Sequence, residues 1–211
     1  QKELAEQGLS LKVYDCYRPQ TAVNDFVRWG KDMGDQKNKD MYYPRVPKSE
    51  LFKRGYIAEK SGHSRASTVD MTLVVVDAKR ARKLVRGPLA DGIEVDMGTP
   101  FDLFDEQSHT DNAQQSPDVQ HNRRWLRSLM QRNGWKNLPE EWWHYTLVSE
   151  PYPEQYFDMP VRSPDGTISI AVPNIGGNII PKSVELVWNV DVVEIEEFVE
   201  ETVEIVRRVD P

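Results

Sequence analysis

Residues 61–76 have the sequence SGHSRASTVDMTLVVV, in which a Gly/Ser-rich loop leads directly into a β-prone segment. The run over residues 69–76 predicts a strand. Asp70 lies at the mouth of this strand, where an apolar strand has little reason to carry a carboxylate unless another group pairs with it. His63 lies in the loop before it, so both side chains can converge on one metal ion. The alternative is that Asp70 accepts hydrogen bonds from backbone N–H groups of the loop.

A second group of polar residues lies in residues 139–146, PEEWWHYT, before and within a strand predicted over residues 142–148. On a regular strand Glu141 and His144 would face opposite ways, because the side-chain period is two. We therefore expect Glu141 in a turn just before the strand and His144 inside the strand. The alternative is an aromatic core around Trp142 and Trp143 that contains a hydrogen-bonded histidine.

A third group, residues 14–19 with the sequence YDCYRP, follows a short strand predicted over residues 9–14. Arg18 is held by Pro19 and could direct a fixed cation into a cleft. The alternative is a surface ion pair between Arg18 and Asp15.

The remaining patterns predict an α+β fold, a small antiparallel sheet that carries the ligands, with helices packed on one side. The composition changes near residue 160. Residues 163–181 are rich in Gly, Pro, Ser and Asn, and residues 184–209 alternate Val or Ile with Glu. We therefore expect a domain over residues 1–161 and a C-terminal appendage, a strand followed by an amphipathic helix, over residues 162–211. Further elements are expected as a helix end over 1–7, helices over 21–34, 77–86 and 122–133, and loops over 35–50 and 89–110.

Composition limits the classes of function. The 211 residues are 38% hydrophobic and 29% charged, enough for one core, and carry a net charge of −7, which argues against a nucleic-acid partner. No stretch is apolar and long enough to span a membrane. A single cysteine, Cys16, excludes an internal disulfide and a zinc site built on several thiolates. Any metal chemistry must therefore use His, Asp and Glu.

The three groups together describe a hydrolase. His63, Asp70 and His144 supply three protein ligands and leave the fourth zinc position open for water, as in catalytic rather than structural sites. A nearby carboxylate could take the proton of that water. Arg18 could hold the oxyanion formed when the water attacks a carbonyl. These parts suit hydrolysis of an amide.

The spacing of these motifs resembles the D-alanyl-D-alanine dipeptidase family, the VanX-like zinc peptidases. The shared features are Ser-x-His followed by Asp after six residues, Glu-x-x-His around a Trp pair, and an upstream Tyr-Arg-Pro. Residues 96–102, DMGTPFD, followed by Ser108-His109, and residues 150–153, EPYP, are also similar to that family. The resemblance covers residues 5–161.

The resemblance implies a Hedgehog/DD-peptidase-like fold and one Zn²⁺ per chain, bound by His63, Asp70 and His144. Glu141 would be the general base and then the proton donor to the leaving amine. Arg18 would stabilise the tetrahedral intermediate. Two further assignments concern the dipeptide itself: Ser61 would touch its backbone and an acidic residue near Asp96 would hold its free ammonium group.

Two departures from the family pattern stand out. Ala66 occupies a position that is usually Gly in the family, which matters if the backbone there needs a positive φ. The family also has a segment before the Tyr-Arg-Pro motif, so we expect the domain over residues 1–161 to lack its N-terminal part. Without the true N-terminus, the bacterial cytoplasm and the periplasm both remain open as the compartment.

The leading hypothesis is zinc-dependent hydrolysis of free D-Ala-D-Ala, with no partner protein identified. One alternative is a zinc D,D-carboxypeptidase or peptidoglycan hydrolase that acts on longer cell-wall peptides. A second alternative, from another class, is a non-catalytic zinc-binding module on the same scaffold. The presence of both Glu141 and Arg18 favours catalysis.

Overall fold

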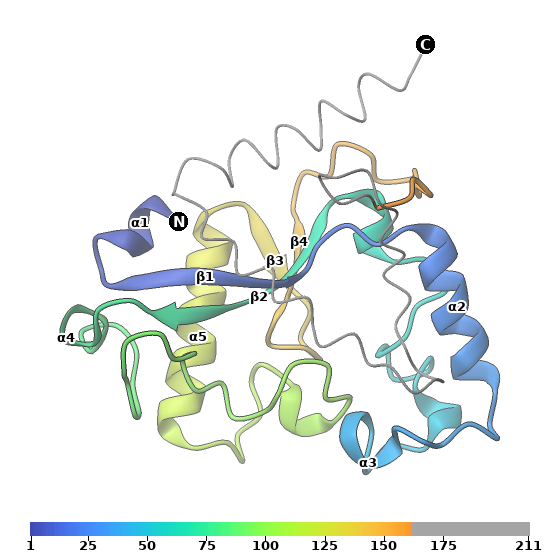
Figure 1. The fold of residues 1–211 in the computed structure, drawn as a ribbon, viewed down its shortest axis with the longest axis horizontal. Helices are drawn as coiled ribbons and strands as arrows, with labels where there is room; N and C mark the ends of the chain where they lie inside the picture. The colour runs from blue at the N-terminus through green and yellow to red at the C-terminus, as the bar shows by residue number, and fades with distance from the viewer. Residues whose placement is uncertain (162–211) are drawn as a thin grey trace.

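The computed structural model describes residues 1–161, and the appendage predicted over residues 162–211 lies outside the described residues. A four-stranded antiparallel sheet with the order β1-β2-β4-β3 forms its centre (Figure 1). Its strands are β1 (Leu9–Asp15), β2 (Thr68–Val75), β3 (Trp135–Asn137) and β4 (His144–Leu147). The predicted α+β class and antiparallel sheet are confirmed.

Two longer helices, three short ones and three 3₁₀ turns connect these strands. The α-helices are α1 (Lys2–Ala5), α2 (Gln20–Lys31), α3 (Lys39–Tyr42), α4 (Ala78–Ala81) and α5 (Pro117–Arg132). The 3₁₀ turns are η1 (Lys48–Glu50), η2 (Gly62–Arg65) and η3 (Glu106–Ser108). Within residues 1–161, no helix is both long and apolar enough to cross a membrane.

The predicted strands over residues 9–14, 69–76 and 142–148 are confirmed to within two residues. β3 was missed, because its three residues are too few to show an alternating pattern. α5 begins at Pro117, five residues before the predicted start. Its N-terminus is marked by Ser116, whose hydroxyl accepts a hydrogen bond from the N–H of Val119 at 3.2 Å, and by a proline in the first turn.

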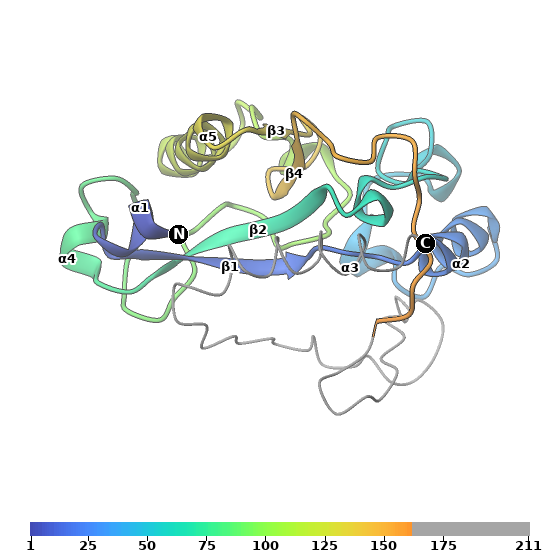
Figure 2. The same ribbon diagram turned by 90° about the horizontal axis from the view of Figure 1, so that it is seen from above.

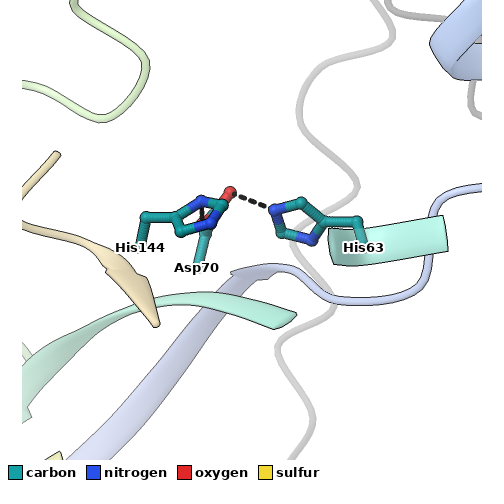
Figure 3. A group of neighbouring side chains, drawn as sticks. All are labelled: His63, Asp70 and His144. Atoms are coloured by element: carbon teal, nitrogen blue, oxygen red, sulfur yellow. Dashed lines mark ion pairs between the residues drawn. The ribbon is translucent and has the colours of Figure 1, made fainter. Parts of the chain in front are cut away.

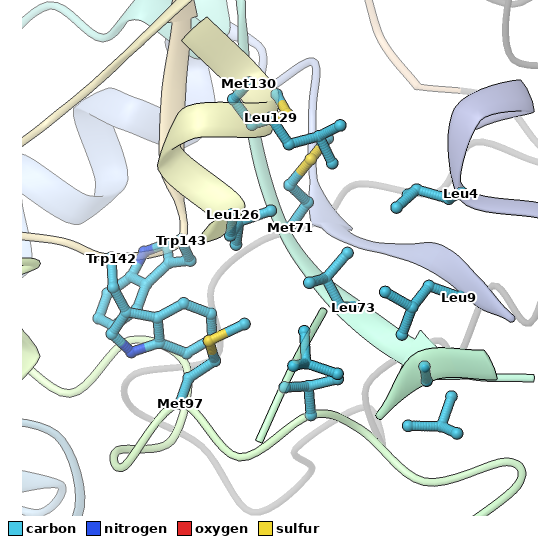
Figure 4. Close-up of a cluster of buried hydrophobic side chains, with 14 of the residues drawn as sticks. Leu4, Leu9, Met71, Leu73, Met97, Leu126, Leu129, Met130, Trp142 and Trp143 are labelled. Carbon is cyan, nitrogen blue, oxygen red and sulfur yellow. The ribbon is translucent and has the colours of Figure 1, made fainter. Parts of the chain in front are cut away.

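The main hydrophobic core lies between the sheet and α5 (Figures 2 and 4). Leu126 and Leu129 on α5 pack toward Met71 and Leu73 on β2, and all four are nearly or fully buried. α1 adds Leu4 to the same cluster. Each side chain of this size stabilises the fold by about 1.5–3 kcal/mol when it is withdrawn from water.

A second hydrophobic cluster packs against residues of α2, the helix that lies beyond one end of the sheet (Figure 1). All but one of its buried members come from the segment predicted as a loop over residues 35–50 and from the residues that follow it. That loop prediction was wrong for α3 and η1. Lys48 accounts for the ordered structure of this segment. Its ammonium donates to the carbonyls of Asp32 and Asp35 at 2.7 and 2.6 Å and lies 4.0 Å from the Trp29 ring centroid. The cluster is made of Tyr43, Val46, Leu51, Tyr56, Ile57 and Phe104.

Candidate metal centre

Strand register brings two of the predicted ligands together. In the β2–β4 pair Asp70 lies opposite His144, so both side chains leave the same face of the sheet. η2 ends just before β2 and presents His63 to the same point (Figure 3). Ser61 begins η2, and its hydroxyl accepts a hydrogen bond from the N–H of His63 at 3.2 Å.

The three side chains form a tight cluster. Asp70 Oδ2 lies 3.3 Å from His63 Nε2, and Asp70 Oδ1 lies 3.0 Å from His144 Nδ1. One ligand atom from each residue lies within 4.8 Å of the others, which is the spacing that one ion needs. His63 and Asp70 are both 2% exposed.

The hydrogen bonds around the cluster fit a bound cation. His63 Nδ1 lies 2.7 Å from the carbonyl oxygen of Cys16, which can only accept, so Nδ1 carries the proton. The lone pair of His63 Nε2 therefore faces the cluster. His63 Nε2 and Asp70 Oδ1 are both buried, and neither forms a hydrogen bond with a group in residues 1–161, although Asp70 Oδ1 lies 3.0 Å from His144 Nδ1. Buried acceptors of this kind would be satisfied by a bound metal ion.

Charge shifts the proton affinity of this cluster. Burial alone would raise the pKa of the Asp70 carboxyl, but His63 and His144, when their rings are protonated, outweigh burial and hold this pKa far below its usual range; a cation bound in their place would act in the same direction. Asp70 is therefore ionised and ready to bind a cation.

Glu141 lies beside the cluster, in the turn that precedes β4, where the sequence predicted it. Its Oε2 atom lies 3.4 Å from His144 Nδ1, and the residue is 7% exposed. Burial, together with the negative charges of Asp70 and Asp102, raises the pKa of the Glu141 carboxyl well above its usual value. Asn137 fixes the turn by donating to the carbonyls of Glu141 and His144 at 2.9 and 3.0 Å.

Arg18 follows β1 and is held by two neighbours. Its Nε and Nη2 atoms donate to Asp15 Oδ2 at 3.0 and 2.5 Å, so the ion pair considered as an alternative does form. Its backbone N–H donates to the carbonyl of His63 at 3.3 Å. Burial lowers the pKa of the Arg18 guanidinium, but Asp15 and Asp70 outweigh burial and raise it. Arg18 is thus a fixed cation whose charge acts on the metal cluster.

Asp96 does not join the cluster. It is exposed, and its carboxylate accepts a hydrogen bond from the N–H of Gly98 at 2.8 Å, which closes a turn. Asp102, at the other end of the same motif, is the acidic residue near the metal ligands. Burial and the charge of Asp70 raise its pKa to about 7, against the opposing charge of Arg18.

The structure, rather than the sequence, distinguishes Asp102 from Asp96. Phe101 packs against Tyr14 and Trp143, with ring centroids 4.5 and 5.5 Å apart, which anchors the residue before Asp102. Asp102 itself adopts φ 60°, a left-handed conformation that is uncommon for residues other than glycine. A strained residue beside a charged cluster often serves function.

A ligand set of two imidazoles and one carboxylate, with a buried glutamate next to it, is the arrangement of a metallopeptidase; a structural metal site would use a fourth protein ligand. Comparison with protein families gives the same class. A family model described as D-ala-D-ala dipeptidase matches residues 1–162, and the chain belongs to this family.

Curated relatives carry the same description. The chain is 42% identical over 162 residues to a D-alanyl-D-alanine dipeptidase of Enterococcus faecium, covering 76% of this chain and 74% of the relative. It is 42% identical over 161 residues to one of Streptomyces coelicolor, covering 76% of this chain and 73% of the relative. A more distant relative from Escherichia coli, with the same name, is 29% identical over 143 residues, covering 66% of this chain and 56% of the relative.

Proposed function

We propose that this protein hydrolyses the dipeptide D-Ala-D-Ala by means of one bound Zn²⁺. The observation that carries the proposal is the cluster of His63, Asp70 and His144, whose ligand atoms lie within 4.8 Å of one another beside Glu141. The substrate follows from the relatives, which are named D-alanyl-D-alanine dipeptidases. We also assign the chain to the Hedgehog/DD-peptidase-like fold.

Zinc fits the donor set. Imidazole nitrogen and carboxylate oxygen are its usual ligands in hydrolytic sites. When bound, Zn²⁺ supplies a Lewis acid that makes water a nucleophile near neutral pH and polarises the scissile carbonyl.

Glu141 acts as the general base and then as the general acid. Its carboxylate accepts a proton from the attacking water and then delivers that proton to the amine of the leaving D-alanine. The raised pKa of Glu141 suits both steps, because a carboxyl with a higher pKa is a stronger base and still a usable acid near neutral pH.

Arg18 and Asp102 act on the substrate. The Arg18 guanidinium, fixed by Asp15, stabilises the oxyanion of the tetrahedral intermediate. Asp102 holds the ammonium group of the dipeptide, a role that the sequence had placed near Asp96. Ser61 stays a proposed contact to the peptide backbone, in addition to its role at the start of η2.

The test is Glu141→Ala, with Glu140→Ala as the matched control, since it removes the same charge one residue away. For Glu141→Ala we expect one zinc per chain, as in the wild type, and a kcat for D-Ala-D-Ala lowered by about 10²–10⁴-fold. Glu140→Ala should keep kcat within a few-fold. Equal turnover by wild type and Glu141→Ala would end the assignment of Glu141, and zinc binding without turnover in the wild type would favour a non-catalytic module.

The choice between free dipeptide and longer cell-wall peptides rests on the ammonium group. N-acetylated D-Ala-D-Ala should be a poor substrate, because acetylation removes the charge that Asp102 would bind. Preference for the acetylated or longer peptide would support the D,D-carboxypeptidase alternative.

A further inference from the structure

Arg123 on α5 is a buried cation outside the metal centre. It is 1% exposed, and its guanidinium donates only to uncharged acceptors. Nε donates to the carbonyl of Met97 at 2.8 Å, and Nη1 donates to the carbonyls of Gln107 and His109 at 2.9 and 2.8 Å. Nη2 lies 3.4 Å from the hydroxyl of Thr99. Within residues 1–161, no carboxylate forms an ion pair with Arg123.

A cation in this position is costly for the fold. Burial lowers the pKa of Arg123 to about 10, with only partial compensation from Asp96. An apolar side chain of similar size would stabilise a hydrophobic core at least as well. The planar guanidinium, however, offers several donors in a fixed fork that can bind carbonyls pointing in different directions.

The acceptors belong to one loop, residues 97–109, which carries Asp102. Arg123 binds both ends of this loop, near Met97 and at His109, so it closes the loop onto α5. Asp102 lies between the two anchored ends, in its left-handed conformation. The anchor therefore limits where the Asp102 carboxylate can lie.

The same loop supports Glu141. The hydroxyl of Thr99 accepts hydrogen bonds from Trp142 Nε1 at 2.9 Å and from Ser108 Oγ at 3.1 Å. The carbonyl of Ser108 accepts the backbone N–H of Trp142 at 3.1 Å. Trp142 directly follows Glu141, so the loop that Arg123 anchors also fixes the residue next to the general base.

We propose that Arg123 is a positioning residue: by anchoring the loop over residues 97–109 it sets Asp102 and Glu141 in place, while it leaves the ligands His63, Asp70 and His144 untouched. The catalytic part of this inference rests on the proposed function; the anchoring part does not. The ligands come from η2, β2 and β4, and the hydrogen bonds of the Arg123 guanidinium go to Met97, Thr99, Gln107 and His109 and to none of these elements.

The experiment compares Arg123→Lys with Arg124→Lys in the full chain. Arg124 is the adjacent, exposed arginine of the same helix, and its guanidinium donates a long hydrogen bond to Gln120 at 3.5 Å. Lysine keeps the positive charge but lacks the planar, forked set of N–H donors of the guanidinium. For Arg123→Lys we expect one zinc per chain, a kcat for D-Ala-D-Ala lowered by about 10–100-fold, and faster amide hydrogen exchange confined to residues 97–109. Arg124→Lys should change none of these.

Thr99→Val provides a second variant in case Arg123→Lys folds poorly. It keeps the arginine and removes the hydroxyl that links the guanidinium to Trp142, and it should lower kcat without loss of zinc. Unchanged kcat in both variants would overturn the positioning role while the proposed function stands. A wild type that binds zinc and cleaves no D-Ala-D-Ala would instead overturn the proposed function, and hydrogen exchange of residues 97–109 would still decide whether Arg123 anchors the loop.

Discussion

At the scale of single residues, Ala66 has a backbone conformation that glycine adopts more easily. Ala66 ends η2 with φ 51° and ψ 32°, a left-handed conformation that costs a residue with a Cβ atom about 1–2 kcal/mol. From the sequence, we expected alanine at this position to be unfavourable only if the backbone φ angle is positive. The angle is positive, so the alanine at this position is strained.

We therefore predict that Ala66→Gly stabilises the protein. Glycine adopts this conformation freely, and part of the gain is lost to its greater freedom in the unfolded chain, which leaves about 0.5–1 kcal/mol. The melting temperature should rise by about 1–4 °C, measured by thermal unfolding with zinc bound.

Gly134→Ala is the converse control, because it places alanine where the chain has a glycine with a positive φ. Gly134 has φ 82°, and a Cβ atom there would meet nothing within 4 Å, so any loss of stability comes from the backbone conformation alone. Gly134→Ala should lower the melting temperature. If Ala66→Gly also lowered it, the strain assigned to Ala66 would be wrong.

The convergence of His63, Asp70 and His144 could be predicted residue by residue, but the proposed role of Asp102 could not. Local patterns predicted that these three side chains meet, and the structure brings their ligand atoms within 4.8 Å of one another. Asp96 and Asp102 lie in one motif and look equivalent in sequence. Only packing of Phe101 and the turn closed by Asp96 separate them, and both depend on contacts distant in the chain.

At the scale of elements, the close approach of η2 to β2 holds His63 against Asp70. A Cβ atom on Gly62 would overlap Thr68 Oγ1, which forms a buried hydrogen bond with Thr146 Oγ1 at 2.9 Å. The glycine at this position thus allows the loop to lie directly on the strand.

Gly62→Ala should therefore destabilise the protein by about 1–3 kcal/mol and weaken zinc binding, because η2 must move away from β2. Thr68→Ala removes the obstructing oxygen at a cost of about 0.5–1.5 kcal/mol. The double variant should be more stable than the sum of the two single effects predicts. Urea unfolding of the four proteins measures this coupling, and strict additivity would show that Gly62 and Thr68 do not meet as described.

The elements that could not be predicted from the sequence are those whose hydrophobic residues show no regular spacing. β3 has three residues, and its pairing with β4 makes it a strand. The segment over residues 35–50 is polar and contains two prolines, yet Lys39 and Lys48 bind backbone carbonyls and order it. Such contacts leave no pattern in hydrophobic spacing.

At the scale of the whole molecule, the candidate metal centre joins segments that lie far apart in the sequence. Removal of zinc should therefore destabilise the entire domain rather than one loop. At a free zinc concentration 100 times its Kd the ion contributes about 2.7 kcal/mol, so a chelator should lower the melting temperature by about 5–10 °C. Asp70→Ala should remove most of the response to chelator. The same melting temperature with and without chelator in the zinc-loaded wild type would contradict the metal site.

The register of β2 and β4 also sets an order of events during synthesis. His63 and Asp70 emerge from the ribosome close together, but His144 reaches them only when β4 pairs with β2. An ion that arrives early would meet only two of the three ligands and would be bound weakly. The full set of three ligands, which the proposed Zn²⁺ needs, is therefore complete only late in folding, after β4 has paired with β2.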